Sequence, residues 1–170
     1  MSEKFLMDTN TFITPYVMFY APDLAPTFWK RLKTSLATNV AILDLVRDEI
    51  LKGEDGLSQW LSQLIDENSI SIIKHGDEKI LHEYSQVLGY LQNDEKYTAR
   101  ALRNWSIESV ADPWLIATAK AYNYTIVTFE TSSGPITTPT GKPKIPDVAN
   151  HFCVKCENLY YYMRQKKIFL

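Results

Sequence analysis

The sequence predicts an α/β fold in which a central parallel sheet carries helices on both faces, and three observations support this prediction. Short, continuously apolar runs at 5–7 and 40–43 are typical of strands that are buried on both faces of a sheet. Segments with helical periodicity separate these runs, as helical crossovers separate parallel strands. The 170 residues, 45% of them hydrophobic, are enough to bury the core of one domain, which we expect to span residues 1–170.

The first half of the chain alternates strands and helices. We expect strands over 5–7, 40–43 and 70–73, and helices over 27–36, 45–51 and 56–65. Between the first strand and the first of these helices, residues 11–20 have a loose helical spacing that Pro15 interrupts. Asp44 and Asp55 stand where N-caps of the following helices would stand.

The second half ends in one further buried strand and an unusual loop. We expect helices over 77–91, 97–105 and 157–167, strands over 125–129 and 152–154, and a helix that begins with Asp112 as N-cap and Pro113 as its first residue. Residues 131–144 are rich in Thr, Ser, Pro and Gly and have no periodicity. Because so long a connection is uncommon in a compact domain, we interpret it as a mobile flap over the functional site.

Four acidic residues define that candidate site. Asp8 ends the first strand, Glu49 lies on the helix after the second strand, Asp112 starts a helix, and Glu130 follows the late strand. The carboxyl ends of parallel strands meet at one edge, where open α/β sheets bind ligands. Carboxylates that converge there without cations would repel one another and lose solvation at high cost. We therefore expect a divalent metal ion among them.

Glu49 is preferred over its neighbour Asp48. Glu49 lies beside Leu45 and Val46 on the face of the helix that we expect to be buried, whereas Asp48 lies further toward solvent. An ordinary surface salt bridge is the alternative role for Glu49, and capping alone is the alternative role for Asp112.

The donor set selects the metal and the chemistry. Hard carboxylate oxygens with few His or Cys nearby favour Mg²⁺ or Mn²⁺, which ionise an attacking water and neutralise charge on a phosphodiester. Thr128 shares the side of the strand that carries Glu130, so its hydroxyl is a candidate supporting donor. Asp147 is either an additional ligand or a helix cap. The chain lacks a Walker-type phosphate loop, a dinucleotide fingerprint and a serine nucleophile elbow.

Several other features are expected to have structural roles. His75 and His82 have no metal-ligand partners in sequence, so we expect surface histidines, and we expect Cys153 and Cys156 to be small semi-buried side chains. The basic clusters at 30–33 and 164–167 are interpreted as solvated helix faces. The net charge of −2 neither supports nor excludes a nucleic-acid partner. With no apolar run that spans a bilayer and no signal-peptide core, we expect a cytoplasmic protein without a membrane partner.

The motifs together resemble a known family. Phe-Leu-Met-Asp8-Thr-Asn10, Glu49 after the second strand, Val-Ala-Asp112-Pro-Trp-Leu-Ile-Ala and Val-Thr128-Phe-Glu130 are similar to the motifs of PIN domains, and more narrowly to the PIN-like DUF4411 group. The resemblance implies a three-layer α/β/α fold and Mg²⁺- or Mn²⁺-dependent endoribonuclease activity on RNA. It implies Asp8, Glu49 and Asp112 as the core acids, Glu130 as the late acid where many PIN domains have Asp, and Asn10 as a polar neighbour.

The resemblance also bears on partners and alternatives. It implies that the protein acts as the toxin of a toxin–antitoxin pair, as VapC-like proteins do. It also implies a possible homodimer, because PIN-like proteins often pair. One alternative is a catalytically inactive PIN-like module that binds RNA or protein. Another is a phosphatase of the haloacid dehalogenase type, but such a phosphatase requires a second acid two residues after the first, and this chain has Asn10 at that position.

Overall fold

The computed structural model describes residues 2–170 and contains a five-stranded sheet in the order β3-β2-β1-β4-β5, in which every neighbouring pair is parallel. The strands are β1 (Phe5–Met7), β2 (Val40–Leu43), β3 (Ser71–Ile73), β4 (Thr125–Val127) and β5 (Cys156–Glu157). All residues of β1, β2 and β4 are buried, as their continuous apolar composition predicts. The predicted α/β fold with a central parallel sheet is confirmed.

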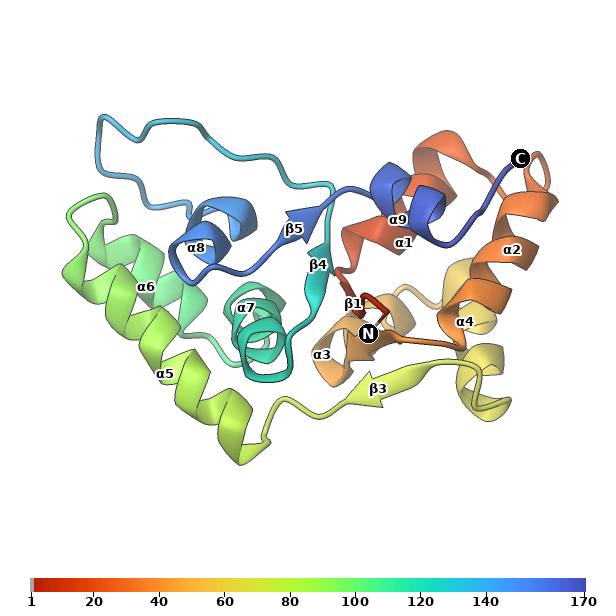
Figure 1. Cartoon of the computed structure of the whole chain (residues 1–170), viewed down its shortest axis with the longest axis horizontal. Helices are drawn as coiled ribbons and strands as arrows, with labels where there is room; N and C mark the ends of the chain where they lie inside the picture. The colour runs from red at the N-terminus through yellow and green to blue at the C-terminus, as the bar shows by residue number, and fades with distance from the viewer. Residues whose placement is uncertain (1) are drawn as a thin grey trace.

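Helices cover both faces of this sheet. They are α1 (Asn10–Thr14), α2 (Pro26–Leu36), α3 (Asp44–Leu51), α4 (Gly56–Asp66), α5 (Glu78–Asn93), α6 (Ala99–Trp105), α7 (Ala111–Tyr122), α8 (Ile145–His151) and α9 (Leu159–Gln165), with a π-helical turn η1 (Pro15–Phe19) after α1. Figure 1 shows α5, α6, α7 and α8 on one side of the strands and α1, α2, α4 and α9 on the other. This is the three-layer arrangement that we expected. Among residues 2–170, none of the helices combines the length and the apolar character needed to cross a bilayer.

Aromatic and small side chains hold the two helical layers against the sheet. The apolar stripe predicted for α2 is buried through Phe28, Trp29, Leu32 and Leu36. Trp29 packs edge-on against Trp60 of α4, with 5.1 Å between ring centroids. In the other layer α7 has an almost fully buried surface, in which Ala117 is 0% exposed, because it lies between β4 and α5. The alanines allow this close approach.

The last strand differs from the prediction. Residues 152–154 were expected to form an edge strand, but they close the carboxyl end of α8: Cys153 adopts a left-handed conformation with φ of 56°, and the Val154 amide donates to the Ala149 carbonyl at 2.9 Å. The strand β5 begins only at Cys156, and α9 begins at Leu159 with Asn158 as its N-cap. The apolar run was a helix terminus and not a strand, a distinction that hydrophobicity alone does not make.

The long loop after β4 also differs from the prediction. It passes away from the Asp8 end of the sheet toward α6 and α8 (Figure 1), and none of residues 131–144 lines the cavity beside Asp8. Backbone hydrogen bonds join Thr140 to Lys96 and Thr98, at 2.9 and 3.0 Å. The expected flap over the site is therefore wrong for this structure, in which the loop packs on the chain before α6.

Candidate active site

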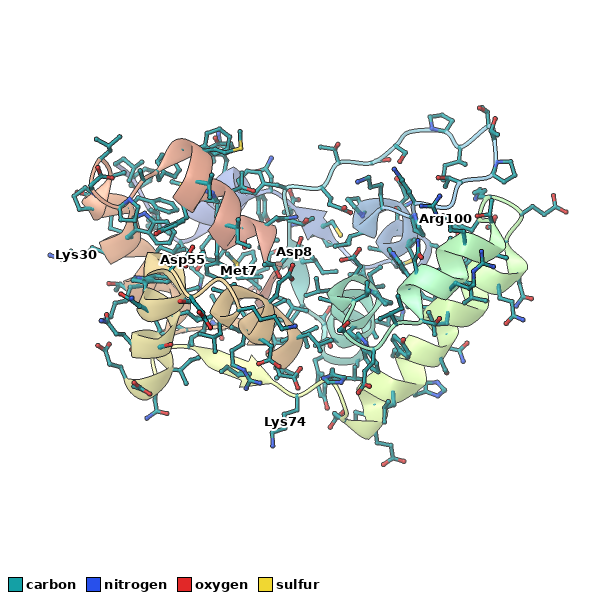
Figure 2. All side chains as sticks on the ribbon, turned by 180° about the vertical axis from the view of Figure 1, so that it is seen from behind. Met7, Asp8, Lys30, Asp55, Lys74 and Arg100 are labelled. Atoms are coloured by element: carbon teal, nitrogen blue, oxygen red, sulfur yellow. The ribbon has the colours of Figure 1, made fainter. Side chains whose placement is uncertain are left out.

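Asp8 lies at the carboxyl end of the central strand, and the chain around it is held by β4. Its backbone amide donates to the Val127 carbonyl at 3.0 Å, which continues the β1–β4 pairing by one residue. The residue is 5% exposed, and its Oδ2 accepts a hydrogen bond from the Thr128 hydroxyl at 2.7 Å. Figure 2 shows Asp8 near the middle of the molecule, between the ribbons of α1 and α3.

The hydroxyl of Thr128 organises this corner. While it donates to Asp8, it accepts from the Asn10 Nδ2 at 3.1 Å and from the Glu130 amide at 3.0 Å. Asn10 also accepts a hydrogen bond from the Phe129 amide through Oδ1, at 2.9 Å. Asn10 and Thr128 thus join the first turn of α1 to the end of β4. Both were expected as supporting residues, and here they fix the position of the Asp8 carboxylate.

Glu49 reaches the same corner from α3. Its Oε2 accepts a hydrogen bond from the hydroxyl of Thr9 at 2.6 Å, which ties α3 to the residue after Asp8. Asp48, the neighbour that we considered, is paired with Arg47 at 2.7 Å. Both acids are exposed, so Glu49 is more solvated than the sequence pattern suggested. The two acids differ in their partners: Glu49 accepts a hydrogen bond from Thr9, next to Asp8, whereas the charge of Asp48 is paired with Arg47 on the same helix.

Asp112 enters the site from the first turn of α7. The expectation that it caps this helix is wrong: Val110 is the N-cap, with extended backbone angles of −82° and 112°, and Asp112 is the second helical residue. Among residues 2–170 no hydrogen bond or ion pair reaches its carboxylate. Because the Asp112 carboxylate does not cap α7, it is available to interact with the other acids of the cavity.

Glu130 is the most engaged of the four acids. Lys144 lies 3.2 Å from its Oε1, and the amide of Ile145 donates to its Oε2 at 2.8 Å. Ile145 is the first residue of α8, so Glu130 satisfies an otherwise unpaired donor at that helix start. This carboxylate is therefore partly neutralised already, in contrast to that of Asp112.

All four acids line one cavity of about 550 Å³. It is also lined by Asn10, Asp48 and Lys52, so negative side chains outnumber positive ones on its walls. Burial raises the pKa of Asp8 to about 6, and the charges of Glu130 and Glu49 act in the same direction. Burial raises the pKa of Asp112 to about 7, again assisted by the neighbouring acids, Asp8 first. These two carboxyl groups resist ionisation until a cation compensates them.

The donor set fits a hard divalent cation, although the side chains are not gathered closely around one. Within residues 2–170, no group of three or more His, Cys, Asp or Glu side chains is arranged to hold a metal ion. The cavity nevertheless offers oxygen donors, mainly carboxylates beside hydroxyl and amide groups, with no sulfur or imidazole ligand among its walls. Oxygen donors of this kind suit Mg²⁺ or Mn²⁺. Asp8, Asp112 and Glu49 are the residues that would hold such an ion.

Other sequence-predicted residues have different surroundings. Asp147 does not line the acid cavity. Its carboxylate accepts hydrogen bonds from the Ser132 hydroxyl and from the Ser133 amide, the latter at 3.0 Å, and so anchors the long loop. His75 is not a free surface histidine: it is half-buried, with Nδ1 2.9 Å from Asp44 Oδ1. His82 is exposed, as expected. Cys153 is exposed and Cys156 half-buried, and both are free thiols.

Sequence reasoning missed two contributors to the site. Thr9, which holds Glu49, and Lys144, which pairs with Glu130, were not singled out. A signal for Thr9 was its position directly after Asp8. For Lys144 the only signal was its place at the start of the helix that follows the long loop, and pairing across 14 residues of irregular chain is not predictable from spacing.

Comparison with known proteins identifies first the class of fold and then the family. The fold is similar to that in the crystal structure of VapBC2 from Rickettsia felis bound to a DNA fragment from their promoter, with a TM-score of 0.53 and 18% sequence identity over 91% of this chain and 97% of that chain. The fold is of the PIN-like class that the motifs led us to expect. Residues 5–170 match the family described as Domain of unknown function (DUF4411), and the chain belongs to this family. No curated protein matches it.

Proposed function

We propose that this protein is a Mg²⁺- or Mn²⁺-dependent endoribonuclease that hydrolyses phosphodiester bonds in RNA. The observation that carries the proposal is the shared cavity of Asp8, Glu49, Asp112 and Glu130 at the carboxyl end of the sheet. The resemblance of these motifs to PIN domains supports RNA as the substrate. Belonging to DUF4411 and the PIN-like fold support the class of protein.

The charge of the cavity requires a cation for this activity. A phosphodiester carries a negative charge, and walls lined mainly by carboxylates would repel it. Bound Mg²⁺ or Mn²⁺ would reverse that local charge, ionise a water and neutralise the charge of the transition state. Asp8 and Asp112 would hold the ion and Glu49 would complete the set from α3, while Glu130 lies at the edge of the cavity beside Lys144. Thr128 and Asn10 orient Asp8 through their hydrogen bonds.

Two isosteric substitutions test the proposal. Asp8→Asn and Asp112→Asn keep the shape of each side chain but remove a charged ligand, so Mn²⁺-dependent cleavage of a single-stranded RNA should fall by at least about a hundredfold. The measurement is the initial rate of cleavage, with circular dichroism to show that each variant is folded.

Asp66→Asn is the matched control, because Asp66 is an exposed acid at the end of α4 and is not a wall of the acid cavity. Its cleavage rate should stay within about twofold of the parent, as expected for an exposed charge remote from the site. If the folded Asp8→Asn and Asp112→Asn variants cut RNA as fast as the parent, the assignment is wrong.

A second candidate is a catalytically inactive PIN-like module that binds RNA or a protein. The ion pair of Glu130 with Lys144 favours it, since one of the four acids is already compensated by the chain itself. Such a module would bind RNA equally well with and without EDTA and would cut none. The Mn²⁺ dependence of cleavage therefore separates the two candidates.

We further propose that the protein acts as the toxin of a toxin–antitoxin pair, which the likeness to the VapBC2 structure supports. Exposed apolar side chains follow the Asp8 loop: Ile13, Val17, Met18 and Phe19 are 38%, 69%, 70% and 51% exposed. Ile13 is also a wall of the acid cavity, so a partner on this patch would lie beside the site. A second copy of the chain could cover the same apolar patch in place of an antitoxin. Co-purification with the product of a neighbouring gene would identify an antitoxin as the partner, whereas a homodimer without it would identify the second copy.

A further inference from the structure

A basic groove is assembled by the fold from two segments that are distant in sequence. It has a volume of about 600 Å³, lies between α2 and the chain after α9, and is lined by four cations, namely Lys30, Arg31, Lys166 and Lys167. We interpreted these residues from the sequence as two separate solvated clusters. The fold instead brings them together across more than 130 residues of sequence, and we call the result the α2 groove.

The walls of the α2 groove have the composition of a phosphate-binding surface. Apart from the four cations they consist of Ser and Thr residues and Ile168, with no carboxylate and no aromatic ring. Thr27, Lys30, Arg31 and Thr34 recur at helical spacing along one face of α2, opposite its buried apolar stripe. An eleven-residue helix is about 16 Å long, so this polar stripe offers an extended rather than a point-like site.

Three of the four cations of the groove make no side-chain contact with a hydrogen-bond or ion-pair partner in the described part of the chain. Among residues 2–170, no ion pair or hydrogen bond involves the side-chain nitrogens of Lys30, Arg31 or Lys167. Lys33, on the next face of α2, shows the contrast, because it pairs with Glu67 at 2.6 Å. Lys166 lies over the ring of Phe5, 5.7 Å from its centroid, and donates to the Thr38 carbonyl, which holds the chain after α9 against α2. In a chain with a net charge of −2, four cations in a groove whose walls have no carboxylate concentrate positive potential there.

We propose that the α2 groove binds the sugar–phosphate backbone of single-stranded RNA outside the cleavage site. The choice of RNA rests on the proposed function, while the preference for a polyanion rests on the groove itself. Lys30 and Asp8 lie well apart in Figure 2, so the groove contacts a part of the RNA remote from the reacting phosphodiester. Because its walls have no aromatic ring on which bases stack, binding is independent of base sequence.

Fluorescence anisotropy with labelled oligouridine, in EDTA to prevent cleavage, tests this proposal. The variant Lys30→Ala/Arg31→Ala replaces two exposed helical residues by the best helix former and should fold normally. Its affinity for RNA should fall by at least about fivefold at low salt. The slope of log K against log salt between about 50 and 200 mM should become shallower by about 1.4, since each phosphate contact on a single strand contributes about 0.7.

The control variant Lys74→Ala/Arg103→Ala removes the same charge from exposed positions elsewhere. It should bind within about twofold of the parent if the groove is specific. Equal losses in the two variants, no RNA binding by the parent, or binding to phosphatidylserine vesicles in place of RNA would each overturn the proposal. Oligoadenosine should bind as tightly as oligouridine, and a preference of more than about tenfold would contradict backbone recognition.

Failure of the groove proposal and failure of the nuclease proposal give different experimental results. If the α2 groove variant binds RNA as the parent does while the parent cleaves with Mn²⁺, the groove inference fails and the nuclease stands. If the groove binds RNA but no divalent ion produces cleavage, the nuclease proposal fails and the groove stands.

Discussion

At the scale of single residues, the buried carboxyl groups of Asp8 and Asp112 destabilise the folded protein when they ionise. Burial raises the pKa of Asp8 to about 6 and that of Asp112 to about 7, both above the ordinary value of 3.8. In the unfolded chain these carboxyl groups ionise near their ordinary pKa and are fully solvated. The folded protein therefore binds more protons than the unfolded chain between about pH 4 and 7, and it loses stability as the pH rises through that window.

Replacement of Asp112 by Asn should stabilise the protein without metal. The amide has no charge to desolvate, so the free energy of unfolding at pH 8 should rise by about 1–3 kcal/mol in EDTA. Below about pH 4, where Asp112 is protonated in both states, the gain should vanish. Urea unfolding at several pH values measures it, and a variant that is less stable than the parent at pH 8 would refute the electrostatic account of this site.

At the scale of elements, two helices that begin with similar sequence signals use their acids differently. Asp55 is the N-cap of α4 and accepts a hydrogen bond from the Ser58 amide at 3.0 Å. Asp112 precedes a proline just as an N-cap would, but α7 begins at Ala111, two residues earlier than predicted, with Val110 as the cap. The start signal thus predicted both helices but misassigned the carboxylate of Asp112. That carboxylate belongs to the candidate site. The same misassignment holds for Asp44, which was expected as a cap but is the first residue of α3, behind the N-cap Leu43.

Replacement of Asp55 by Ala should show what capping contributes where it does occur. The free energy of unfolding should fall by about 1 kcal/mol, because an amide in the first turn of α4 loses its acceptor. Asp55→Asn keeps a cap and should lose no more than a few tenths of that amount. The measurement is again urea unfolding, at pH 7. Equal stability of the Ala variant and the parent would show that water satisfies this helix end as well as Asp55 does.

At the scale of the whole molecule, the site lies where the chain changes direction across the sheet. From β1 the chain builds β2 and β3 on one side, and it later returns to build β4 and β5 on the other. The carboxyl end of β1 therefore faces both halves, and α1, α3, α7 and the end of β4 each contribute a side chain to the cavity. A crevice at such a switch point is the usual ligand site of an open parallel sheet.

Binding of Mn²⁺ should link the two halves and raise the melting temperature. A ligand that binds only the folded state at about a hundred times its dissociation constant stabilises by about 2.7 kcal/mol. The parent should therefore melt several degrees higher with Mn²⁺ at pH 8, and much less so at pH 5, where Asp8 and Asp112 are protonated. The Asp8→Asn and Asp112→Asn variants should show no such shift. An equal shift in all three proteins would locate the ion elsewhere.

Spacing and composition alone predicted the parallel sheet, most of the helices and the candidate acids of this chain, but not the helix α8 (Ile145–His151). The continuous apolar runs at 5–7 and 40–43 do form strands buried on both faces, and an acid directly after such a strand lies at its carboxyl end. Only the tertiary structure decided that Asp112 is not a cap, that Glu49 is held by Thr9, that the 131–144 loop leaves the site uncovered and that two basic clusters form one groove. These features depend on contacts between segments distant in sequence, which local patterns of charge and hydrophobicity do not encode.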